Sequence, residues 1–176
     1  MRRAVAVLLL VLGLAVPARA EVVSSGANGF SLTVTAEIAS TPDAVFKALT
    51  TQIGSWWSPD HTYSGSAANL SLDLRAGGCF CETWPNGGVH HMTVTHVMAP
   101  RTLVMNGGLG PLGTMGVAGA MEWSLTLRNG RTSLQMTYNV GGYAPGGLEA
   151  LAPLVDAVLA SQVKRLAMFV ETGRPQ

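Results

Sequence analysis

Residues 30–38 read FSLTVTAEI and are followed at once by ASTPDAV at 39–45, and this junction decides the fold class. Apolar and polar residues alternate without a break over 30–38, which predicts a half-buried strand. Thr41 is placed to cap a helix, Pro42 suits the first helical position, and Asp43 complements the helix dipole. The stretch therefore predicts a strand that leads directly into a short helix.

The residues after this helix predict strands joined by hairpins. A second short helical or irregular piece is expected over 51–57, ending in Ser58-Pro59-Asp60. Two turn signals follow, Pro85-Asn86-Gly87-Gly88 and Asn129-Gly130. Strands are expected over the apolar or alternating runs around these turns, at 70–75, 79–84, 89–98, 102–106, 121–127 and 134–140.

The last segment changes period. Apolar residues recur at helical spacing from Leu148 to Val170, which predicts a helix over 153–171, with Gly173 as its stop signal. One amphipathic helix can cover one face of an antiparallel sheet. The predicted fold is therefore α+β: a curved antiparallel sheet of about seven strands wrapped on a long C-terminal helix, with two short helices after the first strand.

The N-terminus predicts a signal peptide over 1–20. Met1-Arg2-Arg3 is basic, 4–16 is apolar, and Ala18 and Ala20 are the small residues of a cleavage site. The apolar run is too short to span a bilayer, so we expect no stable membrane anchor. The predicted product is a single domain, 21–176, that is periplasmic or secreted. A formal charge of +1 with 12% charged residues gives no footprint for nucleic acid.

The order of elements resembles the START-like (SRPBCC, helix-grip) superfamily, which includes polyketide cyclases. The closest likeness is to the branch of activators of a heat-shock chaperone's ATPase. It is carried by residues 38–49, by Trp56-Trp57-Ser58-Pro59, by residues 74–80, by the hairpin at 84–87 and by the closing helix. The resemblance implies a helix-grip fold with an apolar ligand held between sheet and helix. It implies no shared catalytic residues and no cofactor, and the chaperone activators differ in working inside the cell.

An apolar cavity is the first candidate site. The alternative is a core filled by the same side chains. The hydroxyl of Tyr138 and an indole N–H of Trp57 or Trp123 are expected to orient the ligand, and one of Trp56 and Trp57 is expected in the core. The candidate cavity residues are Trp56, Trp57, Leu72, Leu74, Trp123, Met136, Tyr138, Val155 and Leu159.

Cys79 and Cys81 form the second candidate site, because residues two apart on a strand share a face. With a two-residue hairpin loop, that face would also hold Met92, Val94, His96 and Met98. Three interpretations stay open: small packing residues, a disulfide, or a soft-metal site for Cu(I) or Zn that uses Cys79, Cys81 and His96. The neighbouring His90-His91 pair is expected to be exposed beside the turn, and the glycine-rich segment 107–113 to be a connection or a lid over the cavity.

These observations predict an exported binding protein for a small hydrophobic or amphipathic molecule, without catalysis. A cyclase- or hydrolase-like enzyme would instead need an ionisable group in the cavity, with His96 and Glu82 as the near candidates. A chaperone-related partner module would show a filled core and an exposed apolar patch around Trp56, Trp57 and Leu112. The sequence leaves the oligomeric state open.

Overall fold

Eight strands form one antiparallel sheet in the computed structural model, which describes residues 18–176. Their order across the sheet is β1-β2-β8-β7-β6-β5-β4-β3. The strands are β1 (Arg19–Gly26), β2 (Gly29–Ile38), β3 (Leu70–Leu72), β4 (Cys79–Trp84), β5 (Gly87–Met98), β6 (Thr102–Gly107), β7 (Ala118–Arg128) and β8 (Arg131–Gly141).

Three of the four α-helices lie where the sequence predicts helical segments, whereas the short helix at 111–114 lies in the glycine-rich segment, where no helix was expected. The α-helices are α1 (Pro42–Thr51), α2 (Ile53–Trp56), α3 (Pro111–Thr114) and α4 (Ala152–Thr172). Single 3-10 turns are η1 (Pro59–His61), η2 (Ala67–Asn69) and η3 (Glu149–Leu151). This confirms the helix-grip arrangement, with α1 and α2 between β2 and β3 and one long helix at the C-terminal end.

Local signals explain where these elements begin and end. The side chain of Thr41 accepts a hydrogen bond from the Ala44 N–H (3.3 Å), so the predicted cap of α1 is confirmed. Gly173 ends α4 in the left-handed conformation that favours glycine (φ 76°). Asn129 and Gly130 also have positive φ values, as the tight turn between β7 and β8 requires.

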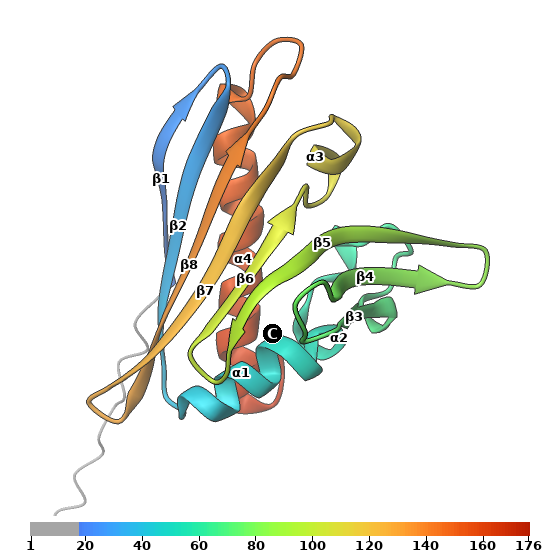
Figure 1. The fold of residues 1–176 in the computed structure, drawn as a ribbon. Helices are drawn as coiled ribbons and strands as arrows, with labels where there is room; N and C mark the ends of the chain where they lie inside the picture. The colour runs from blue at the N-terminus through green and yellow to red at the C-terminus, as the bar shows by residue number, and fades with distance from the viewer. Residues whose placement is uncertain (1–17) are drawn as a thin grey trace, which may run out of the picture.

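The sheet is strongly curved, and Figure 1 shows the β4–β5 hairpin projecting away from the other strands. Two bulges lie in this half of the sheet, one opposite the Phe80–Cys81 step of β4 and one between Val94 and His96 on β5. A bulge bends its strand and increases the local twist. The helix α4 packs on β1 and β2, and the β3–β5 half of the sheet diverges from it.

The core fills the space between α4 and the central strands. Leu159, Val163 and Leu166 of α4 are buried against the inner face of the sheet, which includes Val34 and Met136. Among the described residues, no helix is both long and apolar enough to cross a membrane.

The structure differs from the sequence-based expectation at both ends of the sheet. It adds an edge strand, β1, whose sequence RAEVVSSG lacks regular alternation. It ends β3 at Leu72, so Leu74 is not on a strand; the backbone turns at 73–78, where Arg75 pairs with Asp73 (2.7 Å). Most of the predicted signal peptide, residues 1–17, lies outside the described residues.

Candidate functional site: an apolar cavity with a buried histidine

A cavity of about 420 Å³ lies between the N-terminal half of α4 and the β4–β5 side of the sheet. A volume of this size is in the range of small-molecule sites. The exposed side chains of Tyr63 and Leu154 stand at its mouth, at 50% and 63% exposure. Its walls come from 57–63, β3, β4, β5, the 109–112 segment and η3–α4. The lining residues are Trp57, Asp60, His61, Thr62, Tyr63, Leu70, Phe80, His91, Leu109, Gly110, Pro111, Leu112, Leu151, Leu154, Val155, Val158 and Leu159.

Hydrogen bonds to α4 hold Trp57 in this wall. Gln162 accepts a bond from the Ser58 N–H (2.9 Å), and Arg165 donates to the carbonyl of Trp56 (2.8 Å). The indole N–H of Trp57 donates to the carbonyl of His61 (3.0 Å), and its ring meets Phe80 edge-on. Trp57 therefore presents an apolar ring to the cavity, with its N–H already engaged.

The glycine-rich segment forms another wall. Leu109 donates its backbone N–H to the Tyr138 hydroxyl (3.2 Å), which in turn donates to the carbonyl of Gly107 (3.0 Å). Leu112 is buried, and Leu109 to Leu112 all line the cavity. Tyr138 therefore anchors this wall rather than facing a ligand.

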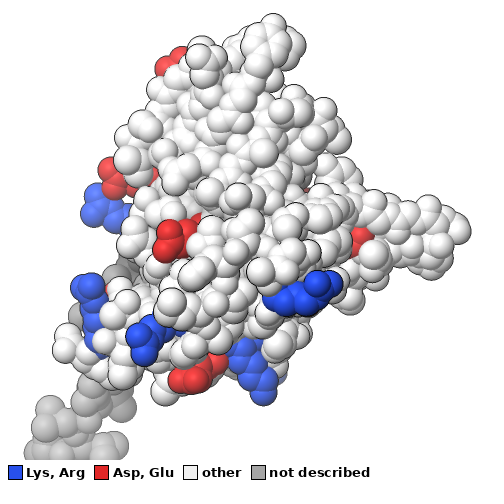
Figure 2. Space-filling view, viewed as in Figure 1, with Lys and Arg blue, Asp and Glu red and all other residues white. Residues whose placement is uncertain are grey.

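Charge is sparse around the cavity. Figure 2 shows few charged side chains on a mostly uncharged face. Asp60 supplies the carboxylate among the described lining residues, and none of these residues is a lysine or an arginine. The cavity is therefore suited to apolar, uncharged molecules.

The bulge between β4 and β5 brings a histidine into the wall. His90 pairs with Cys81 and Met92 pairs with Phe80, which leaves His91 as the extra residue of β5. A bulge allows two consecutive residues to face the same side. His91 and Met92 are both buried, whereas His90 is exposed on the other face. The expectation that both histidines are exposed is therefore wrong for His91.

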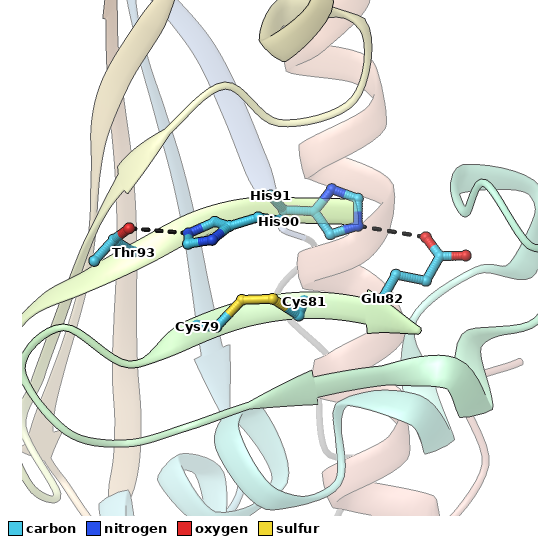
Figure 3. Close-up of a disulfide and its surroundings, with 6 residues drawn as sticks. All are labelled: Cys79, Cys81, Glu82, His90, His91 and Thr93. Carbon is cyan, nitrogen blue, oxygen red and sulfur yellow. Dashed lines mark hydrogen bonds and ion pairs between the residues drawn. A yellow bond between two sulfur atoms is a disulfide. The ribbon is translucent and has the colours of Figure 1, made fainter. Parts of the chain in front are cut away.

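His91 is paired with a buried carboxylate. Its Nε2 lies 3.3 Å from Oε2 of Glu82, and the two side chains are 4% and 0% exposed (Figure 3). Glu82 also accepts hydrogen bonds from the backbone N–H groups of Tyr63 (3.0 Å) and Ser64. This carboxylate therefore holds both His91 and the rim segment that contains Tyr63.

The environment sets the protonation states of the pair. Burial alone would raise the pKa of Glu82, but hydrogen bonds from Ser64, Tyr63 and His91 together bring this pKa below its usual value. Burial lowers the pKa of His91, and this effect outweighs the attraction of Glu82. Near neutral pH the pair is an ionised carboxylate beside a neutral imidazole. A carboxylate only accepts hydrogen bonds, so the imidazole proton is on Nε2.

The other ring nitrogen of His91 has no hydrogen-bond partner within residues 18–176. Nδ1 is buried and makes no hydrogen bond among the described residues. Figure 3 shows it on the side of the ring away from Glu82. Because the proton is on Nε2, Nδ1 is an acceptor. His91 lines the cavity, so this unsatisfied acceptor lies just beneath a mostly apolar wall, where a ligand reaches it when the side chains that cover it shift.

The structure brings three of the predicted cavity residues together, namely Trp57, Val155 and Leu159. The other predicted residues do not line the cavity. Trp56 is core, with its N–H bonded to the carbonyl of Ala48 (2.8 Å). The inner face beneath β7 and β8 is filled rather than hollow, so the space lies toward β4 and β5. The residues outside the lining are Trp56, Leu72, Leu74, Trp123, Met136 and Tyr138.

Cys79 and Cys81 are joined by a disulfide on the outer face of β4 (Figure 3). Their Cα atoms are 5.4 Å apart, a usual distance for a disulfide. The expectation that Met92 and Val94 share the face of the two cysteines is wrong, because the bulge places both residues on the inner face. His90, not His96, lies beside the cysteines: one ligand atom from each of Cys79, Cys81 and His90 falls within 4.8 Å of the others.

Residues 39–170 match the family described as activator of Hsp90 ATPase homolog 1-like protein. The chain belongs to this family. The AHSA1-like match spans α1 to α4 and therefore every wall of the cavity. The sequence matches no curated protein.

Solved structures share the AHSA1-like fold at low identity. CalU16 from Micromonospora echinospora is 16% identical, with a TM-score of 0.58 over 89% of this chain and 86% of that one. A conserved protein of unknown function from Enterococcus faecalis is 14% identical, with a TM-score of 0.60 over 89% and 78%. The Aha1 dimer from Colwellia psychrerythraea is 16% identical, with a TM-score of 0.55 over 81% and 97%. These similarities establish the fold.

Proposed function

We propose that this AHSA1-like protein is an exported binding protein for a small hydrophobic or amphipathic molecule. The observation that carries the proposal is the cavity of about 420 Å³ between α4 and the β4–β5 hairpin, with an apolar wall and an open mouth. Its walls are tied to α4 and β8 by Gln162, Arg165 and Tyr138. Burial of apolar ligand surface contributes about 2.5 kcal/mol for each 100 Å², so a bicyclic molecule fits the site in size and in energy.

The proposal of export rests on the N-terminal sequence. Residues 1–20 have the basic start, apolar run and small residues of a secretory signal. A disulfide such as Cys79–Cys81 is stable in the oxidising compartment to which such a signal leads. The proposed location is the periplasm or the extracellular space.

Titration with N-phenyl-1-naphthylamine, a neutral apolar fluorophore, tests the binding function. We expect a saturable rise in fluorescence with one probe bound per chain, and loss of the signal when the protein is unfolded in urea. A linear, non-saturating signal on the folded protein would contradict the proposal.

Catalysis is a second candidate, and the Glu82–His91 pair favours it. A neutral imidazole oriented by a carboxylate is the arrangement of a general base, and His91 lines the cavity. Glu82 and His96 are the residues that the sequence offers for this role, but His96 is exposed on β5. Hydrolysis of p-nitrophenyl acetate by the unmodified chain that is lost in His91→Phe would favour this candidate. Equal hydrolysis rates for the unmodified chain and His91→Phe would oppose it.

The chaperone-related alternative loses the feature on which it was based. Trp56, Trp57 and Leu112 are 0%, 5% and 1% exposed, so they form no exposed apolar patch. The cavity is also open rather than filled. Binding of a small molecule is therefore the better-supported function.

A further inference from the structure

We propose that the ligand of this cavity carries a hydroxyl or N–H group that donates a hydrogen bond to Nδ1 of His91. This inference rests on the proposed binding function and adds the chemical class of the ligand: an uncharged apolar molecule with one hydrogen-bond donor.

His91 carries an unsatisfied acceptor. His91 is 5% exposed and lines the cavity, and its Nδ1 has no partner among the described residues. Buried polar atoms in folded proteins are nearly always hydrogen-bonded, and an unpaired one opposes folding. A donor brought by a ligand would satisfy this atom once the side chains that cover it move aside.

The orientation of the His91 ring is fixed. Glu82 accepts the Nε2 proton of His91 at 3.3 Å, and the carboxylate is itself held by the backbone N–H groups of Tyr63 and Ser64. Turning the ring over would break the bond to Glu82. Nδ1 therefore stays an acceptor, and a ligand that offers only acceptor atoms leaves it unpaired.

The surroundings of the His91 ring favour an uncharged aromatic ligand. The rings of Phe80 and Tyr63 lie 5.1 and 6.0 Å from the imidazole, centroid to centroid, so aromatic surface flanks the acceptor. Asp60 lines the cavity, and Glu82 stands directly behind His91. The described wall holds no lysine or arginine, so these negative charges would repel a carboxylate ligand. They would not repel an uncharged, phenol-like molecule.

Three matched probes test the inference by titration calorimetry on the oxidised chain. They are 2-naphthol, which has a donor; 2-methoxynaphthalene, which has the same ring without a donor; and 2-naphthoate, which is anionic. We expect 2-naphthol to bind about tenfold or more tightly than the ether, corresponding to about 1.4 kcal/mol, and 2-naphthoate to bind most weakly. Sites built for a donor discriminate strongly against analogues that lack it.

The variant His91→Phe keeps the ring volume and removes the acceptor. We expect it to lose the preference for 2-naphthol and still to bind the ether, which reports that the variant is folded. Nitrogen-15 NMR of the unmodified chain gives a second readout, in which only 2-naphthol shifts the Nδ1 resonance of His91.

The outcomes separate the inference from the proposed function. Equal affinity for 2-naphthol and the ether, with an unchanged Nδ1 resonance, would overturn the inference and leave the binding function standing. Failure of all three probes to bind would overturn both. Tightest binding of 2-naphthoate would overturn the inference and point to an anionic ligand.

Discussion

Nε2 of His91 lies 3.3 Å from Oε2 of Glu82, and both side chains are buried beside a mostly apolar cavity. The two residues come from adjacent strands, β5 and β4, and the bulge between those strands turns His91 inward. Glu82 also holds the rim segment at Tyr63 and Ser64. One carboxylate therefore supports both the polar group of the site and part of its mouth.

Glu82→Gln should destabilise the protein by about 1–3 kcal/mol, because hydrogen bonds to a buried charged group are lost or weakened. Urea unfolding measures the effect. Glu122→Gln is the matched control on β7: this glutamate is exposed and contacts Ser124, so its loss should cost less than about 0.5 kcal/mol. Equal effects of the two substitutions would show that the buried pair has no special role.

Acid should destabilise the protein, starting at mildly acidic pH. The pKa of His91 in the folded chain is below its ordinary value of about 6.5, so the unfolded chain binds this proton first as the pH falls. The contribution of neutral His91 to the free energy of unfolding is fully present above about pH 6.5. It is lost as the pH falls through the pKa of His91 in the folded chain. Glu82 acts in the same direction at lower pH, because its pKa is also lowered. Burial raises the pKa of Asp156, which acts in the opposite direction.

Urea midpoints at pH 7.5, 6.5 and 5.5 measure this dependence. The unmodified chain should lose stability over this range, and His91→Phe should lose less. Parallel pH profiles for the two proteins would contradict the assignment of this loss to His91.

Val158→Trp should block the cavity from the α4 side. Val158 is a lining residue, and an indole in its place would occupy the space that a ligand needs. We expect binding of N-phenyl-1-naphthylamine to fall at least tenfold. Val23→Trp on the exposed surface of β1 is the control and should bind as the unmodified chain does. Undiminished binding by Val158→Trp would place the probe elsewhere.

The disulfide closes a ring of only three residues, so its removal should change stability modestly. The chain-entropy relation gives about 1.6 kcal/mol for such a short loop, and we expect Cys79→Ser/Cys81→Ser to unfold within about 2 kcal/mol of the unmodified chain. The intact mass of exported protein should be about 2 Da below the fully reduced mass. Free thiols in freshly exported protein would contradict this prediction.

Export itself is tested at the N-terminus. Sequencing of the protein recovered from the periplasm or medium should give Glu21 as the first residue, because Ala18 and Ala20 form the expected cleavage site. An N-terminus at Met1, or retention of the chain in the cytoplasm, would contradict it.

Much of the fold could be predicted because its signals are local. The alternation over 30–38, the cap at Thr41 and the turn at Asn129-Gly130 each depend on neighbouring residues, and each lies where the sequence predicts. The edge strand β1 was missed because Val22, Val23 and Ser24 do not alternate, and a register shift interrupts its pairing there.

The candidate site was harder to predict because it depends on register. A single extra residue on β5 sends His91 inward and separates Met92 from the face of Cys79. No sequence pattern marks that bulge. The hollow region depends on how far the β4–β5 hairpin diverges from α4, which hydrophobic periodicity does not report. Trp57, Val155 and Leu159 were found because they are apolar residues on elements that face the interior.

A crystal structure of the oxidised chain soaked with 2-naphthol would show both where the probe binds and what its hydroxyl contacts. We expect the ring system between Trp57 and α4, with its hydroxyl at hydrogen-bond distance, about 2.8 Å, from Nδ1 of His91. An empty cavity at saturating probe concentration, or a probe bound only outside it, would contradict the claim that this cavity is the binding site.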